Sequence, residues 1–241
     1  MERKNIDMKF KPFEKMSGKE FLHFCLMAIC SGVMVGIGAL ASLSAQALLG
    51  DWGKLIGAFL FSLGIFAIVS FDMKLFTGMV ADVPTLGIKN CWRLPVCFAF
   101  NVIGVMLITG LARYSPVSEI VIEKGGAALG AKLLQEDWAL RALCSSILCG
   151  ILITISVKAK DYAPKKGLSA TFGVVLPIVV FAFCGFDHSV ANVVYFCYLG
   201  QWTWQVLWYT LITMIGNFLG GVMLPSIYSL RMHVMRKKEE K

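Results

Sequence analysis

The sequence predicts an all-α membrane protein with six transmembrane helices in two inverted three-helix repeats. Hydrophobic residues make up 57% of the 241 positions and charged residues 16%, whereas soluble domains have about 45–50% and about 25%. Six apolar segments reach the roughly 20 residues needed to cross a bilayer. The second and fifth of these segments are interrupted by similar polar motifs. These observations favour a membrane bundle in which helices 2 and 5 are broken.

The six predicted spans follow one another along the chain. They are expected at residues 21–49, 55–83, 90–112, 138–158, 169–198 and 203–230. The first apolar run is much longer than the roughly 7–15-residue core of a secretory signal, so we interpret it as a retained helix. The spans divide the chain into an N-terminal segment (1–20), a six-helix transmembrane domain (21–230) and a basic C-terminal tail (231–241).

Basic residues indicate the orientation. Seventeen of the 23 Lys and Arg residues lie in the two end segments, the second-to-third connection or the fourth-to-fifth connection. Because cytoplasmic loops carry an excess of Lys and Arg, both termini are expected in the cytoplasm. The net charge of +8 is interpreted as a basic rim facing anionic lipid, so the lipid bilayer is a partner and nucleic acid is not.

Neither an enzyme nor a cofactor or metal site is expected. The chain contains no HExxH or GxSxG motif, and its three histidines are far apart in the sequence. None of the eight cysteines forms a CxxC pair, and nearly all of them fall inside apolar segments. They are therefore expected to be buried thiols rather than disulfides or zinc ligands.

The two interrupted spans carry the signal of an internal repeat. "VSFDMKLFTG" at 69–78 and "FCGFDHSVAN" at 183–192 both contain Phe-Asp, and the two pairs are 115 residues apart. "FNVIGV" around Asn101 and "GNFLGG" around Asn217 are 116 residues apart. A repeated unit with an odd number of spans has opposite orientations in its two copies. Inverted repeats with broken helices point to a permeation site near the membrane midplane, because irregular backbone at that depth must be buried or line a cavity.

His188 is the leading candidate in this site. An imidazole has an ordinary pKa near 6.5, so it can exchange a proton near neutrality. A buried core histidine is the alternative, but its place in a broken helix beside Asp187 and Asn192 favours a role in a proton relay. Thr77 either binds an anion or His188, or caps the half-helix that follows, and Gly78 supplies the permissive backbone of the break.

The remaining polar residues of the breaks are expected to be scaffold. Asn101 and Asn217 favour hydrogen bonds between helices, near glycines that permit close approach. Asp72 and Asp187 are equivalent at a spacing of 115 residues, which suggests a shared role in holding each break, such as capping a half-helix. On that alignment Lys74 has no counterpart. It either extends to the cytoplasmic side or adds a cation near the pore.

These motifs resemble those of the formate/nitrite transporter family. "KLFTG" at 74–78 is similar to the family signature at the second-helix break, "GFDHSVAN" at 185–192 resembles the fifth-helix break, and "GNFLGG" at 216–221 resembles the sixth-helix motif. "LFSLG" at 60–64 and "LP" at 176–177 also fit. Three positions depart from the family pattern: Lys74 replaces Glu, Met79 replaces Asn, and Gly150 stands where the fourth helix usually has Asn.

The resemblance implies an aquaporin-like fold and a homopentamer in which each protomer has its own pore. It implies passage of small monovalent weak-acid anions, such as formate, nitrite or hydrosulfide, together with protons across the bacterial cytoplasmic membrane. The residues implied to narrow the pore are Phe61, Ile65, Phe76, Ile153 and Phe181. Lys132 is similar to the family lysine that enriches anions at the pore mouth, with Lys124 as the competing candidate.

The mechanism favoured at this point is a channel. The anion would lose water at an apolar slit, gain a proton through His188 and cross in neutral form. An obligate proton–anion symporter with alternating access is the alternative, and the sequence does not separate the two.

Overall fold

The chain folds into a bundle of long apolar helices. The computed structural model describes residues 16–116, 118–162, 168–200 and 202–239. Within this part of the chain, five helices are long and apolar enough to cross a membrane: Gly18–Leu48, Gly50–Ser70, Arg93–Ala112, Trp138–Ala159 and Trp204–Leu230. A sixth span is formed by two helices, Thr171–Cys184 and Ser189–Tyr198, which meet at an angle of 49°. The predicted all-α architecture with six spans is confirmed.

Shorter helices complete the bundle around the two breaks. In chain order the elements are α1 (Gly18–Leu48), η1 (Gly50–Trp52), α2 (Gly53–Ser70), α3 (Phe76–Val80), α4 (Val83–Leu86), η2 (Ile88–Asn90), α5 (Arg93–Ala112), α6 (Ser118–Leu133), α7 (Trp138–Tyr162), α8 (Leu168–Cys184), α9 (Ser189–Leu199) and α10 (Trp204–Glu239).

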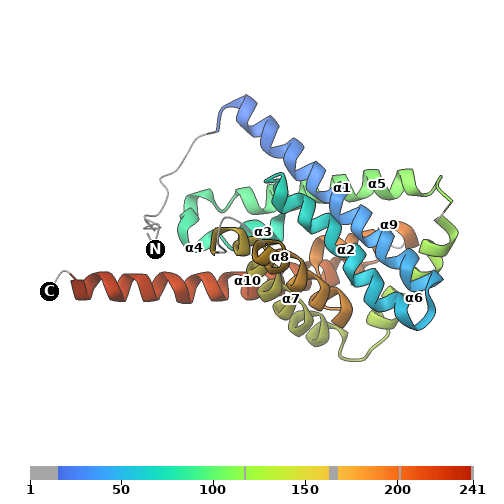
Figure 1. Ribbon diagram of the computed structural model, residues 1–241. Coiled ribbons are helices and arrows are strands. Elements are labelled where there is room, and N and C mark those ends of the chain that lie inside the picture. Colours follow the sequence, from blue (N-terminus) through green and yellow to red (C-terminus); the bar gives the residue numbers. More distant parts are fainter. Residues whose placement is uncertain (1–15, 117, 163–167, 201, 240–241) are drawn as a thin grey trace.

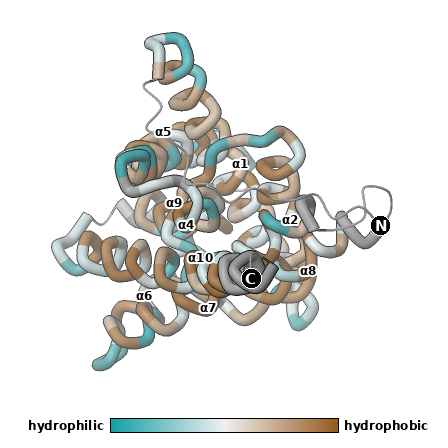
Figure 2. The backbone as a smooth tube through the Cα atoms, turned by 90° about the vertical axis from the view of Figure 1, so that its left-hand side faces the viewer, coloured by the Kyte–Doolittle hydropathy of each residue, from teal (hydrophilic) through white to brown (hydrophobic). Residues whose placement is uncertain are grey.

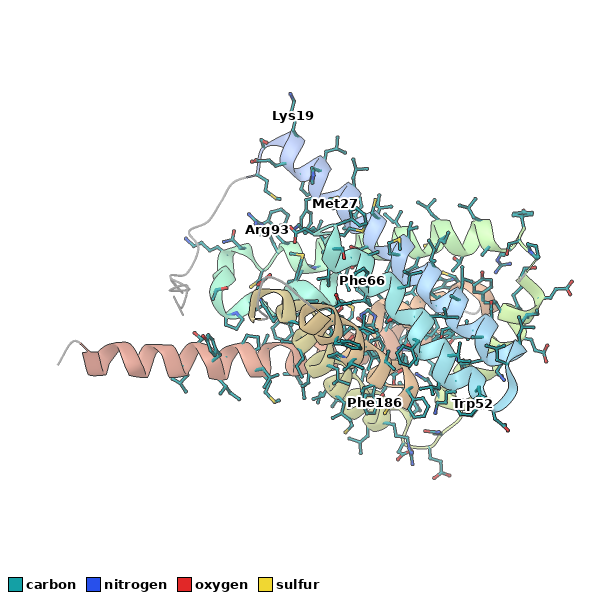
Figure 3. The ribbon with its side chains drawn as sticks, in the orientation of Figure 1. Lys19, Met27, Trp52, Phe66, Arg93 and Phe186 are labelled. Atoms are coloured by element: carbon teal, nitrogen blue, oxygen red, sulfur yellow. The ribbon has the colours of Figure 1, made fainter. Side chains whose placement is uncertain are left out.

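The spans run between two faces of the bundle (Figure 1). We call the face where α1 begins and α10 ends the terminal face, and the face where α1 ends and α7 begins the opposite face. Lys19 and Arg93 lie towards the terminal face, and Trp52 lies at the opposite face (Figure 3). A capping box starts α1, because the Ser17 hydroxyl accepts from the Glu20 backbone N–H while the Glu20 carboxylate accepts from the Ser17 N–H.

Apolar residues cover the outside of the bundle as well as its inside. Figure 2 shows hydrophobic colour along the long helices and hydrophilic colour mainly where the chain turns between them. Large side chains such as Leu63, Leu107 and Ile215 are exposed. In water this surface would be unfavourable, but in lipid it meets surroundings of its own polarity. The exposed apolar surface therefore agrees with a membrane location.

The two halves of the chain pack alike. In the first half α1 lies against α2 and α5, and in the second half α7 lies against α8 and α10. Each half contains an equivalent glycine at a close helix contact, because a Cβ at Gly32 would collide with the backbone of Asn101, and one at Gly150 with the backbone of Asn217. Gly150, a departure from the family pattern, therefore has a packing role equivalent to that of Gly32.

Some predicted boundaries were wrong. The second span was expected over 55–83 with an interruption at 69–78, and in the structure the short helix α3 after the break ends at Val80. The helix α6, between the third and fourth spans, was not predicted. The sixth span ends at Leu230 as expected, and the helix α10 itself continues to Glu239 and extends beyond the bundle (Figure 1). Residues 1–15 and 240–241 of the predicted end segments lie outside the described residues.

Candidate permeation site

Each broken span turns at a residue with a positive φ angle. In the first break this residue is Asp72, with φ 53°, and in the second it is Gly185, with φ 75°. Aspartate is one of the few side chains that tolerate this left-handed conformation. The positions are 113 residues apart. The next hydrogen bond repeats at the same spacing, from Met73 N to Ile68 O (2.9 Å) and from Phe186 N to Phe181 O (3.0 Å).

The side-chain amide of Asn101 holds the first break. Its Oδ1 accepts from the backbone N–H of Phe76 at 2.9 Å, at the start of α3. Its Nδ2 donates to the carbonyls of Ala28 (2.8 Å) and Lys74 (2.9 Å). The amide therefore satisfies two backbone groups that the interruption of the helix leaves without helical partners, and it ties the break to the α1 carbonyl of Ala28. Asn101 is fully buried.

Asn217 makes the same set of contacts at the second break. Its Oδ1 accepts from the backbone N–H of Ser189 at 2.8 Å, and its Nδ2 donates to the carbonyls of Ser146 (2.8 Å) and Asp187 (2.9 Å). Asn217 is also fully buried. These contacts with backbone atoms favour the scaffold interpretation of both asparagines over direct contact with a substrate.

The hydrogen bonds correct the predicted alignment of the two breaks. Phe-Asp pairs suggested a spacing of 115, but the backbone geometry repeats at 113. Lys74 is therefore the counterpart of Asp187, since each carbonyl accepts from a scaffold asparagine. The proposed equivalence of Asp72 and Asp187 as caps is wrong: the residues at the cap positions are Leu75 and His188. Asp72 is exposed, whereas Asp187 is buried.

His188 and Thr77 join the two broken spans. Thr77 Oγ1 and His188 Nε2 are 2.9 Å apart, and each residue is 1% exposed. His188 Nδ1 accepts from the backbone N–H of Ala191 at 3.1 Å, so the ring also caps α9. Because Nδ1 is an acceptor, the neutral imidazole carries its proton on Nε2 and donates it to Thr77. The two residues that the sequence singled out from separate repeats thus meet at one buried point.

Apolar rings surround this polar pair. Phe181 stacks on the His188 ring with centroids 5.9 Å apart, and Phe61 meets Phe181 edge-on at 5.4 Å. Phe76, next to Thr77 in the chain, is buried and meets Phe98 edge-on. All five side chains predicted to narrow the pore are buried in one hydrophobic core: Phe61, Ile65, Phe76, Ile153 and Phe181. Figure 3 shows how densely side chains fill this interior.

Asp187 is the centre of a charged network at the second break. Its Oδ1 accepts from Lys132 Nζ (2.6 Å), Asn192 Nδ2 (3.1 Å) and the Tyr209 hydroxyl (2.7 Å). Lys132 Nζ also lies 3.4 Å from Gly185 O. Asp187 is 4% exposed, so its charge is balanced inside the protein rather than by water.

The first break has a different environment. Lys74 Nζ lies 3.2 Å from Asp72 Oδ2, and these side chains are 35% and 75% exposed. Lys158, at the end of α7, pairs with Asp82 at 2.6 Å. All four charged side chains line a cavity of about 300 Å³. Lys74 therefore lines a cavity beside the break and is partly exposed at the terminal face.

Sequence reasoning missed two members of these clusters. Tyr209 lies in the sixth span, 22 residues from Asp187, and no motif connects it with the break. Lys158 was counted only as a loop charge that sets the orientation. Of the two lysines considered for the opposite face, Lys132 reaches the break, while no contact to it from Lys124 is seen among the described residues. Across those residues, no group of three or more His, Cys, Asp or Glu could hold a metal ion, and all eight cysteines are free.

This fold and site define a class: a multi-pass membrane protein of channel type, with two broken helices that meet at a buried polar pair. Comparison with known families narrows the class. The model of the family described as "Formate/nitrite transporter" matches residues 10–230. This chain therefore belongs to the formate/nitrite transporter family. The family is one of transporters, as the sequence predicted.

Curated relatives include formate channels. "Formate channel FocA" of Haemophilus influenzae is 30% identical over 155 residues, which are 58% of this chain and 53% of the relative. "Formate channel FocA" of Escherichia coli K12 is 29% identical over 184 residues, 69% of this chain and 62% of the relative. The matches thus span between half and two thirds of the length of these relatives. A "Probable formate transporter" of Methanothermobacter thermautotrophicus is 26% identical over 198 residues, 70% of this chain and 71% of the relative.

Solved structures share the fold. A structure described as "Pentameric formate channel with formate bound" superimposes with a TM-score of 0.77 at 18% identity, covering 91% of this chain and 100% of the other. An "FNT family ion channel" gives a TM-score of 0.75 at 20% identity, with 89% and 91% covered. The predicted broken-helix channel fold is therefore confirmed over most of the chain.

Proposed function

We propose that this protein conducts small monovalent weak-acid anions, with formate as the leading substrate, and that His188 acts in protonating the anion at the constriction. The observation that carries the proposal is the buried hydrogen bond between Thr77 and His188, which joins the two broken spans inside an apolar shell. The names of the curated relatives support formate as a substrate. We also propose that the terminal face is cytoplasmic.

Protonation removes the main obstacle to passage. The idealised cost of moving a bare carboxylate-sized ion from water into a medium of low polarity is about 20 kcal/mol. The rings of Phe61 and Phe181 close the way to His188, so an anion passing them loses most of its water. A weak acid that takes up a proton at this point crosses as a neutral molecule and loses the proton again on the far side.

Lys132 and Asn192 supply donors on the approach from the opposite face. An ammonium group has three N–H bonds. Among the described residues, Lys132 directs these bonds at Asp187 and the Gly185 carbonyl, which leaves one for a passing anion. Because Asp187 balances the charge of Lys132, the lysine acts as a local donor more than as a source of net positive field.

The ring of His188 sets a condition on proton transfer. In the neutral ring the Nε2–H can donate a hydrogen bond to Thr77 or to the anion. To give that proton away, the ring must first gain a second proton from water on Nδ1, where it now accepts the Ala191 N–H. The proton on Nε2 then passes to the anion and leaves a neutral ring protonated on Nδ1. Uptake of a proton from water on Nε2 and release of the one on Nδ1 restore the starting ring. Losing the bond from Ala191 costs about 1–3 kcal/mol, so proton transfer and loosening of the α9 cap occur together.

A homopentamer is the proposed assembly, with one permeation site in each protomer. The large exposed apolar surface of the bundle can meet either lipid or neighbouring copies. The solved relative described as pentameric supports five copies. Mass measurement of the detergent-solubilised complex tests this, and a monomer as the only species in several mild detergents would contradict it.

The function is tested by uptake of labelled formate into proteoliposomes with imposed pH gradients. We expect uptake that rises when the inside is alkaline, and loss of that pH dependence in His188→Phe. His188→Asn is the matched variant, because an Asn side chain can still accept the Ala191 N–H at the cap position but has no titratable ring. We expect it to fold normally and to lose the pH dependence as well.

Two outcomes would contradict the proposal. Absence of anion uptake by the folded wild-type protein would overturn the channel function. Unchanged pH dependence in His188→Asn would overturn the role of the ring while leaving the channel intact. Current carried by formate under voltage without a pH gradient separates a channel from an obligate proton–anion symporter.

A further inference from the structure

The cavity at the terminal face lies directly in front of the first break. It has a volume of about 300 Å³, and its walls come from the end of α2, the break, the start of α3 and the end of α7. Lys74 enters the wall from the break itself, and Lys158 enters from α7. Gly78, one residue after Thr77, lies in the same wall. The cavity therefore reaches from the surface to the chain neighbour of Thr77, the residue that contacts His188.

Both lysines in this cavity have exposed carboxylate partners. Asp72, the partner of Lys74, has a side chain that is 75% exposed, and Asp82, the partner of Lys158, has one that is 51% exposed. Pairs of this kind contribute about 0–1 kcal/mol, because water solvates the separated charges almost as well. An anion in the cavity can therefore replace either carboxylate at its lysine at little cost.

The pair at the other break cannot exchange in this way. Asp187 is 4% exposed and holds Lys132, Asn192 and Tyr209 at once. Removing its carboxylate from Lys132 would leave a buried charge and two buried donors without a partner, which is costly. The two approaches to the constriction thus differ: one presents a fixed pair and the other presents lysines with exchangeable partners.

We propose that the cavity is a docking site for a small monovalent carboxylate, in which Lys74 binds the anion in exchange for Asp72, and Lys158 adds a second cation. This inference rests on the proposed function and deepens it by naming a binding site that faces the cytoplasm. Lys74 determines the affinity with which the protein binds the anion from that side. The site lowers the concentration of anion at which export half-saturates, without changing the equilibrium across the membrane.

Two substitutions at one ion pair give opposite results if the site exists. Lys74→Gln removes the cation, so half-saturation from the cytoplasmic side should need up to about fivefold more formate, the upper limit for one exposed ion pair. Asp72→Asn removes the competitor and keeps a residue that tolerates a positive φ angle. It should lower the half-saturating concentration. A purely structural ion pair would make both variants change in the same direction.

The experiment measures formate flux in right-side-out and inside-out vesicles, at low and high ionic strength. The effects should appear only from the cytoplasmic side and should shrink at high salt, because salt screens exposed charges. Lys158→Gln should act like Lys74→Gln with a smaller effect. Lys89→Gln is the matched control, since Lys89 is an exposed lysine of the same face that does not line the cavity, and we expect no change.

The outcomes separate this inference from the proposed function. Anion flux with unchanged half-saturation in Lys74→Gln would overturn the docking site and leave the channel function standing. Shifts in the same direction for Lys74→Gln and Asp72→Asn would overturn the exchange of partners. Absence of flux in the wild-type protein would overturn the proposed function itself.

Discussion

The two breaks of this protein have the same backbone and different side-chain chemistry. Each turns at a residue with positive φ, and each is held by one buried asparagine that hydrogen-bonds to three backbone groups. At the equivalent position after the turn, one break has Lys74 in an exposed pair and the other has Asp187 in a buried network. His188 in the second break corresponds to Leu75 in the first. The proton chemistry of the site is therefore asymmetric although its scaffold is symmetric.

The comparison shows which properties a repeat must keep. A helix broken inside a membrane leaves backbone groups that no water can satisfy, so both copies retain the asparagine and the close glycine contact. The charged side chains are not needed to satisfy these backbone groups. They differ between the copies, and in our proposal this difference gives the two faces of the protein different affinities for an anion.

The largest expected effect is loss of the buried charge at the second break. Asp187→Ala leaves Lys132, Asn192 and Tyr209 without their shared acceptor and should lower the free energy of unfolding by about 3 kcal/mol. Asp72→Ala removes an exposed carboxylate and should cost less than about 1 kcal/mol. Thermal unfolding in a mild detergent measures both. Equal losses would show that the two breaks are electrostatically alike after all.

Removal of either scaffold amide should have a similar, intermediate effect. Asn101→Ala and Asn217→Ala each leave buried backbone groups unsatisfied, which costs about 1–3 kcal/mol. Gln46→Ala is a control, because among the described residues that amide donates to the Ser42 hydroxyl one turn away, and we expect a change within about 0.5 kcal/mol. If one of these two substitutions lowered the free energy of unfolding far more than the other, the scaffold would not be symmetric.

Substitutions at the turn of the second break should have smaller effects. Gly185→Ala places a Cβ at φ 75° and should cost about 1–2 kcal/mol. Gly185→Asn should cost less, because the first break already accepts Asp72 in this conformation. Gly130→Ala, inside α6 with open space around it, should stabilise the protein by about 0.5–1 kcal/mol. A Gly185→Ala variant as stable as the wild type would show that the second turn can change conformation.

The smallest expected effect on stability is that of Lys74→Gln. Its exposed pair with Asp72 contributes at most about 1 kcal/mol, so the unfolding temperature should barely move while transport from the terminal face changes. Lys132→Gln should lower the unfolding temperature more, because it leaves Asp187 buried without its counter-ion. A large stability loss in Lys74→Gln would mean that this lysine holds the break rather than facing the anion.

Much of the fold could be predicted because the local composition of the chain determines where the spans and the breaks lie. Long apolar runs define the spans, and the polar interruptions around Thr77 and His188 locate the two breaks. The helix α6 was missed because it is too short and too polar to look like a span. The second span was expected to end at residue 83, three residues past the end of α3, because composition does not show where a half-helix stops.

The site could be predicted only in part. Thr77, His188 and the two asparagines stand out because polar residues are costly in apolar segments. The register of the repeat was wrong by two residues, because the matching Phe-Asp pairs do not occupy equivalent backbone positions. Tyr209 gave no signal, since a tyrosine in an apolar helix is common and its contact with Asp187 depends on how α10 packs.

The sequence by itself determined the membrane location, the six spans and the residue types at the breaks, because the cost of placing polar groups in lipid acts at each position separately. The tertiary structure alone decided which of these residues meet. The pairing of Lys132 with Asp187, the placement of Lys74 beside a cavity and the contact between Thr77 and His188 all join residues that are distant in the chain. Such contacts depend on the packing of several helices, which no single stretch of the sequence specifies.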